Sequence, residues 1–162
     1  MDQKEPKAQA KILIVDDDPE MRLAMHVRLK ANNYAVGFAV DGVSGVAEAR
    51  RQMPDVILLD LGLPAGDGFT VLERLQANDT LSCIPVIVVS GRDRAAHRDR
   101  SLKAGARIFL QKPVRNSDLL LAIEQVLGVK SHPPSSVIYD IDTNPKQSAF
   151  DLNATPLLRN TA

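Results

Sequence analysis

The fold is decided by the stretch Asp55-Val56-Ile57-Leu58-Leu59-Asp60-Leu61-Gly62-Leu63-Pro64. Its four consecutive apolar residues, Val56 to Leu59, are typical of a strand covered on both faces, as in parallel sheets. Gly62 and Pro64 then prevent the strand from continuing. Asp60 is therefore predicted to lie at the carboxyl end of a buried strand, where open α/β sheets place their ligand sites. Taken alone, an Asp at this position more often simply opens a turn.

Strand-like and helix-like segments alternate along residues 11–128. The predicted strands lie at 12–15, 34–40, 56–59, 85–89 and 107–111, and the predicted helices lie at 19–32, 43–53, from 68 onward, 93–104 and 116–127. Such alternation is typical of an α/β fold, in which right-handed crossovers join parallel strands. We therefore expect a doubly wound, five-stranded parallel sheet with helices on both faces.

The first two helices have recognisable buried and exposed sides. Asp18 before Pro19 is typical of an N-cap followed by proline at the first helical position. The first helix is expected to bury Met21, Ala24, Met25 and Leu29, with the stem of Arg28 beside them. Leu23 and Val27 lie on its opposite side and should be exposed. The second helix is expected to bury Val43, Val46, Ala47 and Ala49.

Composition and charge exclude several classes of protein. The chain has 162 residues, of which 44% are apolar, which suits one domain plus a short extra segment. Its 20 basic and 20 acidic residues cancel, which gives no electrostatic footprint for nucleic acid or for an acidic membrane surface. Cys83 is the single cysteine, which excludes an internal disulfide and a cysteine-based metal cage. Because Cys83 precedes an apolar run, we expect it to be a small buried hydrophobic residue.

The two ends of the chain differ from its centre. Residues 1–10 are polar and charged, without the apolar segment of a signal peptide, and are expected to form a disordered leader. Residues 130–162 are rich in Pro, Ser, Thr and Asn and should form a flexible tail, or else a short strand or helix that docks on the domain or on a partner. No apolar run approaches the ~20 residues of a membrane helix, so a cytoplasmic protein is expected.

Polar side chains follow four of the predicted strands. Asp16 and Asp17 follow the first strand, Asp60 follows the third, and Ser90 and Lys112 come at the ends of the fourth and fifth. The carboxyl ends of parallel strands share one edge of the sheet, so these side chains should lie together. Three close carboxylates repel one another, and at least one pKa should rise unless a cation neutralises them. An all-oxygen cluster without His or Cys selects a hard ion, Mg²⁺ first and Mn²⁺ second.

The other two side chains complement this cluster. Lys112 is a compact cation that can contact a carboxylate or a bound phosphate, and Ser90 offers a short hydroxyl donor. With a cation site, these are the parts needed for phosphoryl transfer to a carboxylate, and Asp60 is the candidate nucleophile. Each part alone also has a plainer interpretation, as a cap, a loop residue or a surface lysine. Their joint occurrence on these four strands supports the hypothesis.

Four motifs of the chain are highly specific when taken together. They are KILIVDDDP at 11–19, DVILLDLGLP at 55–64 with GDG at 66–68, PVIVVSG at 85–91, and KP at 112–113. They resemble the receiver domain of two-component response regulators, and the resemblance covers nearly the full length of such a domain. It implies a flavodoxin-like sheet with strand order 2-1-3-4-5 and a receiver domain over residues 11–129.

The resemblance also implies how the acidic cluster works. Asp60 would be the phosphoacceptor. The Mg²⁺ would be bound by Asp16, Asp17 and Asp60, with the backbone carbonyl of Gly62 as a further ligand. Lys112 would contact the phosphoryl group.

The remaining implied roles concern a conformational switch. Ser90 would be pulled toward the phosphoryl group while the ring of Phe109 fills the space that Ser90 leaves. This movement would reshape the face made by the fourth helix, the fifth strand and the fifth helix. Many family members have Tyr or His where this chain has Phe109, so any hydrogen bond from that ring to a partner is expected to be lost. A cis bond is implied between Lys112 and Pro113.

A signalling role implies partners on both sides of the phosphorylation. The phosphoryl group would come from a histidine kinase or a histidine phosphotransfer protein, and the signal would pass to a downstream protein target. Receivers dock the phosphodonor near the first helix, so Leu23 and Val27 are expected to form part of that dock, although scattered exposed apolar residues are common. The charged fourth helix either pairs across a homodimer or faces solvent; its charges are Arg94, Arg98, Asp99, Arg100 and Lys103.

Three classes of function remain open. The first, which we favour, is a stand-alone receiver without an output domain, which catalyses only its own phosphorylation and dephosphorylation and is not a turnover enzyme. The second is a phosphatase or phosphotransferase with an aspartyl nucleophile. Such enzymes usually carry an acid two residues after the nucleophile, where this chain has Gly62. The third is a degenerate receiver used as a scaffold, which the complete set of site residues disfavours.

Overall fold

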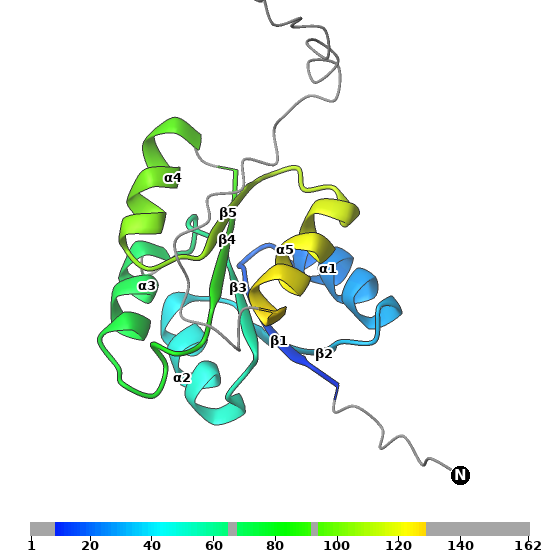
Figure 1. Ribbon diagram of the computed structural model, residues 1–162, viewed down its shortest axis with the longest axis horizontal. Helices are drawn as coiled ribbons and strands as arrows, with labels where there is room; N and C mark the ends of the chain where they lie inside the picture. Colours follow the sequence, from blue (N-terminus) through cyan, green and yellow to red (C-terminus); the bar gives the residue numbers. More distant parts are fainter. Residues whose placement is uncertain (1–8, 65–67, 92–93, 129–162) are drawn as a thin grey trace, which may run out of the picture.

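Strands and helices alternate along the chain in its structure, a computed structural model (Figure 1). The described residues are 9–64, 68–91 and 94–128, with only the backbone described at 94 and 95. The strands are β1 (Lys11–Val15), β2 (Ala35–Ala39), β3 (Val56–Leu59), β4 (Val86–Ser90) and β5 (Ile108–Gln111). The helices are α1 (Pro19–Ala31), α2 (Gly42–Gln52), α3 (Gly68–Gln76), α4 (Arg94–Lys103) and α5 (Asn116–Gly128).

The five strands form one parallel sheet in the order β2-β1-β3-β4-β5. Val15 of β1 is paired with Leu59 of β3, which is paired in turn with Val88 of β4. Val88 is paired with Phe109 of β5. The register therefore brings the carboxyl ends of the central strands to one edge of the sheet. The predicted fold class and strand order are confirmed.

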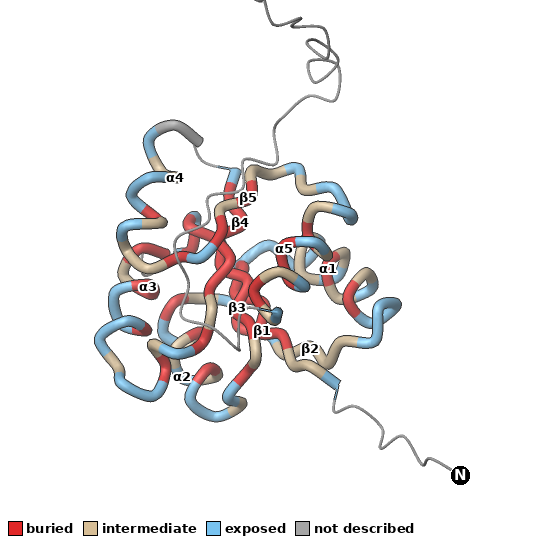
Figure 2. The backbone as a smooth tube through the Cα atoms, viewed as in Figure 1, coloured by how far each residue is buried: buried red, intermediate tan, exposed pale blue. Residues whose placement is uncertain are grey.

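The core has one half on each face of the sheet. Helices α2, α3 and α4 cover one face, and α1 and α5 cover the other (Figure 1). All four side chains of β3 are buried, as expected for a central strand between two helical layers. Figure 2 shows the same pattern, with the buried residues concentrated in the sheet and the exposed residues on the outer sides of the helices.

Two expectations about burial were wrong. Cys83 is exposed, because it lies in the turn before β4 and the buried run begins one residue later, at Ile84. In α2, Val43 is 62% exposed and Ala47 is also exposed. The buried residues of α2 are Gly42, Gly45 and Ala49, with Val46 partly buried.

The reason for the second error is the close approach of α2 to the sheet. A Cβ on Gly45 would lie 2.9 Å from Cγ1 of Val15. The helix thus turns its smallest residues to β1, and its larger apolar residues lie at the edge of the contact, where they are partly or largely exposed. A hydrophobicity pattern weights Val above Gly and so misplaces the buried side.

Some sequence predictions fall outside the described residues. These are residues 1–8 of the leader, Gly66 and Asp67 of the loop before α3, and the tail at 130–162. Gln9 and Ala10, at the start of the described part, contact β2 and the turn before it: Ala35 N–H donates to the Ala10 carbonyl at 2.9 Å, and Gln9 Nε2 donates to Asn33 Oδ1 at 3.2 Å. Within the described residues, no helix has the length and apolar character needed to cross a bilayer.

The first prediction concerns the close approach of α3 to the strand end that carries Asp60. A Cβ on Gly68 would lie 2.5 Å from the carbonyl oxygen of Asp60 and 2.6 Å from Cα of Leu61. Both atoms belong to the backbone, which yields less easily than a side chain. We expect Gly68→Ala to lower the free energy of unfolding by about 1–3 kcal/mol, measured by urea denaturation.

Gly91→Ala is the matched control for this variant. The nearest atom to its new Cβ would be Cβ of Lys112, at 4.0 Å, so its effect should stay within about 0.5 kcal/mol. Equal losses in the two variants would contradict the close-approach explanation.

Candidate functional site

The side chains singled out in the sequence meet at the carboxyl edge of the sheet. Asp16 directly follows β1, Asp60 directly follows β3, Ser90 ends β4, and Lys112 directly follows β5. Backbone hydrogen bonds hold these strand ends together: Asp60 N–H donates to the carbonyl of Val15 at 2.9 Å, and Lys112 N–H donates to the carbonyl of Ser90 at 2.9 Å. The site is therefore positioned by the sheet itself.

Three carboxylates form a compact cluster at this edge. Asp16, Asp17 and Asp60 each offer an oxygen atom within 4.8 Å of the others. Asp16 and Asp60 are buried, and Asp17 is exposed. A set of carboxylate oxygens with one side open to solvent fits a hard divalent cation that keeps some of its water, as Mg²⁺ does.

Lys112 supplies the positive charge that the cluster needs. Its Nζ lies 2.8 Å from Oδ2 of Asp16, in a charge-assisted hydrogen bond, and 3.7 Å from Oδ1 of Asp60. One ammonium group thus serves two buried carboxylates and is closer to Asp16. This leaves the negative charge of Asp60 less fully compensated than that of Asp16.

The pKa of Asp60 is raised above its usual value of 3.8. Burial is the largest cause, and the charges of Asp16 and Asp17 add to it. The nearby Lys112 and the backbone N–H of Gly62, which donates to the Asp60 carboxylate, act in the opposite direction and lower this pKa. The predicted upward shift within the cluster thus falls on Asp60.

Asp18 has a different task from its two neighbours. Its Oδ1 accepts hydrogen bonds from the backbone N–H groups of Glu20 and Met21, at 2.9 and 3.2 Å, and so caps α1. The N-cap prediction is confirmed. The backbone N–H of Asp18 in turn donates to Oδ1 of Asp16 at 2.9 Å, which helps to hold the Asp16 carboxylate in place.

The backbone around Asp60 and Lys112 is shaped closely to the site. A Cβ on Gly62 would lie 3.1 Å from Oδ2 of Asp60, so a side chain at this position would crowd the carboxylate. The bond between Lys112 and Pro113 is cis, as the resemblance implied.

Ser90 and Phe109 lie on the same face of the sheet. Val86 and Val88 pack into the core beneath α2, α3 and α4, so alternation places the fully buried Ser90 on that side as well. The ring of Phe109 is partly buried against the same core and lies beside Val88 in the register. The two residues implied to act as a switch therefore share the space under α4.

Two polar residues of this region were missed in the sequence. Arg22 of α1 donates from Nη1 to the Asp16 carbonyl at 2.7 Å. Gln111 is paired with Ser90 in the register, and its Oε1 is buried without a hydrogen-bond partner among the residues that the structure describes. The Arg22 contact depends on the angle at which α1 leaves the sheet, and an apolar pattern carries no signal for it.

The first helix presents the exposed apolar side that was predicted. Leu23 is 64% exposed and Val27 is 59% exposed, one helical turn apart on α1. Met25 and Leu29 are buried on the opposite side, and Arg28 reaches across to donate to the carbonyl of Val114 at 3.2 Å. The predicted orientation of α1 is confirmed.

Comparison with known proteins identifies the family. The family model described as "response regulator receiver domain" matches residues 12–124. This chain belongs to that family. As a receiver, it is similar to the protein PilH of Pseudomonas aeruginosa, with 38% identity over 119 residues that cover 74% of this chain and 98% of PilH. It is also similar to the response regulator PleD of Caulobacter vibrioides, with 38% identity over 122 residues that cover 75% of this chain and only 27% of PleD.

The solved structures agree with this assignment of the receiver. One similar structure is the receiver domain of a sensor histidine kinase from Pseudomonas aeruginosa, solved with a magnesium ion coordinated in its active site cleft. It shares 29% identity and superposes with a TM-score of 0.70, covering 75% of this chain and 99% of that domain. The fold and the strand-end cluster of this receiver are those of a two-component signalling domain.

The raised pKa of Asp60 leads to a pH-dependent prediction. A raised folded-state pKa means that Asp60 contributes stability below about 3.8, and that this stability is lost as the pH rises through the folded-state pKa. Asp60→Asn has no ionisable group at this position, so it does not lose this stability as the pH rises. In EDTA, the variant should therefore be more stable than the native chain at neutral pH, and its advantage should shrink as the pH falls toward 3.8, measured by chemical denaturation.

Asp41→Asn is the control of opposite sign. The backbone N–H of Ser44 is the largest cause that lowers the pKa of Asp41, the N-cap of α2. Its charge therefore favours folding above the usual pKa, and replacing it should give no gain at neutral pH. An Asp60→Asn variant that is no more stable at neutral pH would contradict the burial argument.

Proposed function

We propose that this receiver accepts a phosphoryl group on Asp60 from a histidine kinase or a histidine phosphotransfer protein, and signals through a changed protein surface. The observation that carries the proposal is the environment of Asp60. It is a buried carboxylate with a raised pKa, 3.7 Å from the ammonium of Lys112 and within the cluster formed with Asp16 and Asp17. A nucleophile needs such neutralising groups before it can approach a phosphoryl group that is itself negative.

The cation would be held by the carboxylates of Asp16, Asp17 and Asp60 and by the backbone carbonyl of Gly62. When bound, Mg²⁺ supplies positive charge to the phosphoryl oxygens. The donor set supports this choice because it consists of oxygen atoms with an exposed side at Asp17. Mn²⁺ suits the same ligands and is proposed as a substitute.

Asp60, Lys112 and Gly62 have separate roles in the phosphoryl transfer. An oxygen of Asp60 attacks the phosphorus, a P–O bond forms, and the P–N bond to the donor imidazole breaks with its electron pair left on the nitrogen. Lys112 already lies between Asp16 and Asp60, so it can contact the arriving phosphoryl oxygens with little movement. Because Gly62 has no side chain, it does not crowd the Asp60 carboxylate.

The output follows from Ser90 and Phe109. Ser90 donates its hydroxyl hydrogen to a phosphoryl oxygen, and the Phe109 ring moves into the space that Ser90 leaves. Their shared position beneath α4 supports this coupling, because a movement of either changes the packing under that helix. The surface of α4, β5 and α5 would then be recognised by a downstream protein. Without a hydroxyl, Phe109 acts in this switch by shape alone.

The direct test is chemical phosphorylation followed by intact mass measurement. With acetyl phosphate and Mg²⁺, the native chain should gain one labile phosphate, and Mn²⁺ should replace Mg²⁺. Asp60→Asn should gain none. Asp18→Asn is the matched control, because asparagine also caps a helix and Asp18 lies outside the cluster; it should be phosphorylated like the native chain.

The same experiment separates the rival functions. We propose a signalling module rather than a turnover enzyme, so after the acetyl phosphate is removed each chain should release its one bound phosphate and no more. Sustained release of phosphate from many substrates would instead indicate an aspartyl-nucleophile phosphatase. An unchanged mass would indicate a degenerate receiver used as a scaffold.

A further prediction concerns the surface that receives the phosphodonor. We propose that Leu23 and Val27, exposed on α1, form part of this dock. Replacing them together by Leu23→Gln and Val27→Thr should slow transfer from the cognate phosphodonor by about tenfold or more, which corresponds to about 1.4 kcal/mol. Phosphorylation by acetyl phosphate should not change, because the small donor needs no dock.

Leu121→Gln on α5 is the matched control for the dock. It removes an apolar side chain that is 58% exposed, comparable to the exposure of Leu23 and Val27. If the double substitution leaves the rate of transfer from the cognate donor unchanged, Leu23 and Val27 are not part of the dock.

A further inference from the structure

Strand β2 forms one edge of the sheet, and within residues 9–64, 68–91 and 94–128 no strand pairs with its outer side. The Ala35 N–H donates to the carbonyl of Ala10, and the Ala39 carbonyl accepts from the N–H of Asp16, so the groups of residues 35 and 39 face β1. Alternation along the strand places those of Gly37 on the same side. The N–H and C=O groups of Val36 and Phe38 therefore point outward, where another strand can pair with them.

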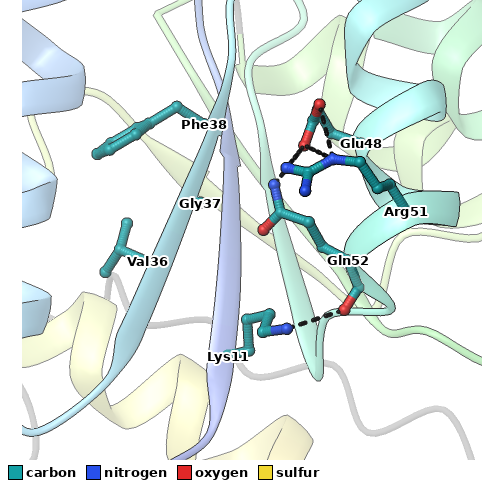
Figure 3. Close-up of a pocket in the computed structure, with 7 residues that line it drawn as sticks. All are labelled: Lys11, Val36, Gly37, Phe38, Glu48, Arg51 and Gln52. Carbon is teal, nitrogen blue, oxygen red and sulfur yellow. Dashed lines mark hydrogen bonds and ion pairs between the residues drawn. The ribbon is translucent and has the colours of Figure 1, made fainter.

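A groove of about 500 Å³ lies along this edge. Figure 3 shows Val36 and Phe38 pointing to one side of β2, while Gln52, Glu48 and Arg51 of α2 lie on the other side. The lining residues are Lys11, Val36, Gly37, Phe38, Glu48, Arg51 and Gln52. The groove thus follows the outer edge of β2, and residues from both faces of that strand lie beside it.

The two edges of the sheet differ in their protection against pairing. Strand β5, the other edge, is preceded by Arg107 and followed by Lys112 and Pro113, and charged residues and proline block edge-to-edge association. Strand β2 reads Ala-Val-Gly-Phe-Ala and has neither a charge nor a proline. Its Phe38 is 40% exposed, and Val40 just after it is 48% exposed. An edge with these features is suited to receive a strand.

The sequence of β2 indicates which strand can pair with this edge. We propose that two copies of this chain pair antiparallel through β2, about a two-fold axis at Gly37. In this register Val36 lies opposite Phe38 of the second copy, and both are residues whose backbone groups point outward. Each of these two pairs can exchange two hydrogen bonds, and each combines an aromatic with a β-branched side chain, a favourable cross-strand pair.

The opposite face of β2 is compatible with the same axis. It carries Ala35, Gly37 and Ala39, which are small, and the Gln52 side chain of α2 lies over Gly37. Here α2 contributes both signs of charge, with Glu48 and the 70% exposed Arg51 as an ion pair of 2.6 Å. A two-fold axis brings the same surface of each copy together, so that Arg51 of one copy can meet Glu48 of the other. A surface of one sign would repel its own copy.

The first test measures the oligomeric state of the full chain by sedimentation velocity over a range of concentrations. The native chain should show a monomer–dimer equilibrium, and Phe38→Lys should raise its dissociation constant by about tenfold or more. Leu121→Lys introduces the same charge at an exposed apolar position on α5 and should leave the equilibrium unchanged. Circular dichroism checks that both variants are folded. A native chain that stays monomeric, or a dimer broken by Leu121→Lys and not by Phe38→Lys, overturns the proposal.

The second test probes the register by disulfide formation and does not depend on Phe38. The background carries Cys83→Ser, which removes the native thiol, and Gln52→Ala, because the Gln52 side chain occupies the place of a Cβ at residue 37. Gly37→Cys lies on the proposed axis opposite its own copy, and mild oxidation should convert it to a covalent dimer. Ala35→Cys, two residues from the axis, should stay monomeric. Equal cross-linking at both positions, or none at residue 37, contradicts the register.

Discussion

The ammonium group of Lys112 is the interaction on which the site depends. It lies 2.8 Å from Asp16 and 3.7 Å from Asp60, two carboxylates that the sheet buries at adjacent strand ends. Burial and repulsion by the neighbouring carboxylates both favour the neutral form of Asp60. One lysine compensates them only in part, and the pKa of Asp60 remains raised. Part of the negative charge of the site is therefore not neutralised by Lys112, as a site for a divalent cation requires.

The sheet makes this arrangement possible by holding residues that are far apart in the sequence. Asp16 and Lys112 are separated by 96 positions, yet they share a hydrogen bond. Backbone bonds between neighbouring strand ends set their positions, and the glycine at 68 allows α3 to lie close against the backbone of Asp60. The same rigid framework supports the coupling of Ser90 to Phe109, because both side chains lie under α4 on one face of the sheet. A structural change at the strand ends can therefore alter the packing, and with it the outer surface, of α4.

Much of the fold and of the site could be predicted because their signals are local. Buried parallel strands read as continuous apolar runs, and Asp18 with Pro19 marks the start of α1. The errors have physical causes. Cys83 was placed in the core because it adjoins the buried run, although that run begins at Ile84. Val43 was assigned to the buried side of α2, where the helix in fact turns Gly42 and Gly45 to the sheet. Close helix–sheet approach depends on three-dimensional packing, and hydrophobicity does not report it.

The sequence by itself determined the alternation of strands and helices, the residues at the strand ends, and the family to which the chain belongs. These follow from apolar periodicity, turn chemistry and motif spacing, which are properties of neighbouring residues. The tertiary structure alone decided how the carboxylate charges are shared, with Lys112 nearer to Asp16 and the raised pKa on Asp60. It also decided that Arg22 reaches the Asp16 carbonyl and that β2 is an edge strand among the described strands. Distances and solvent exposure set these features, and they exist only once distant segments have packed together.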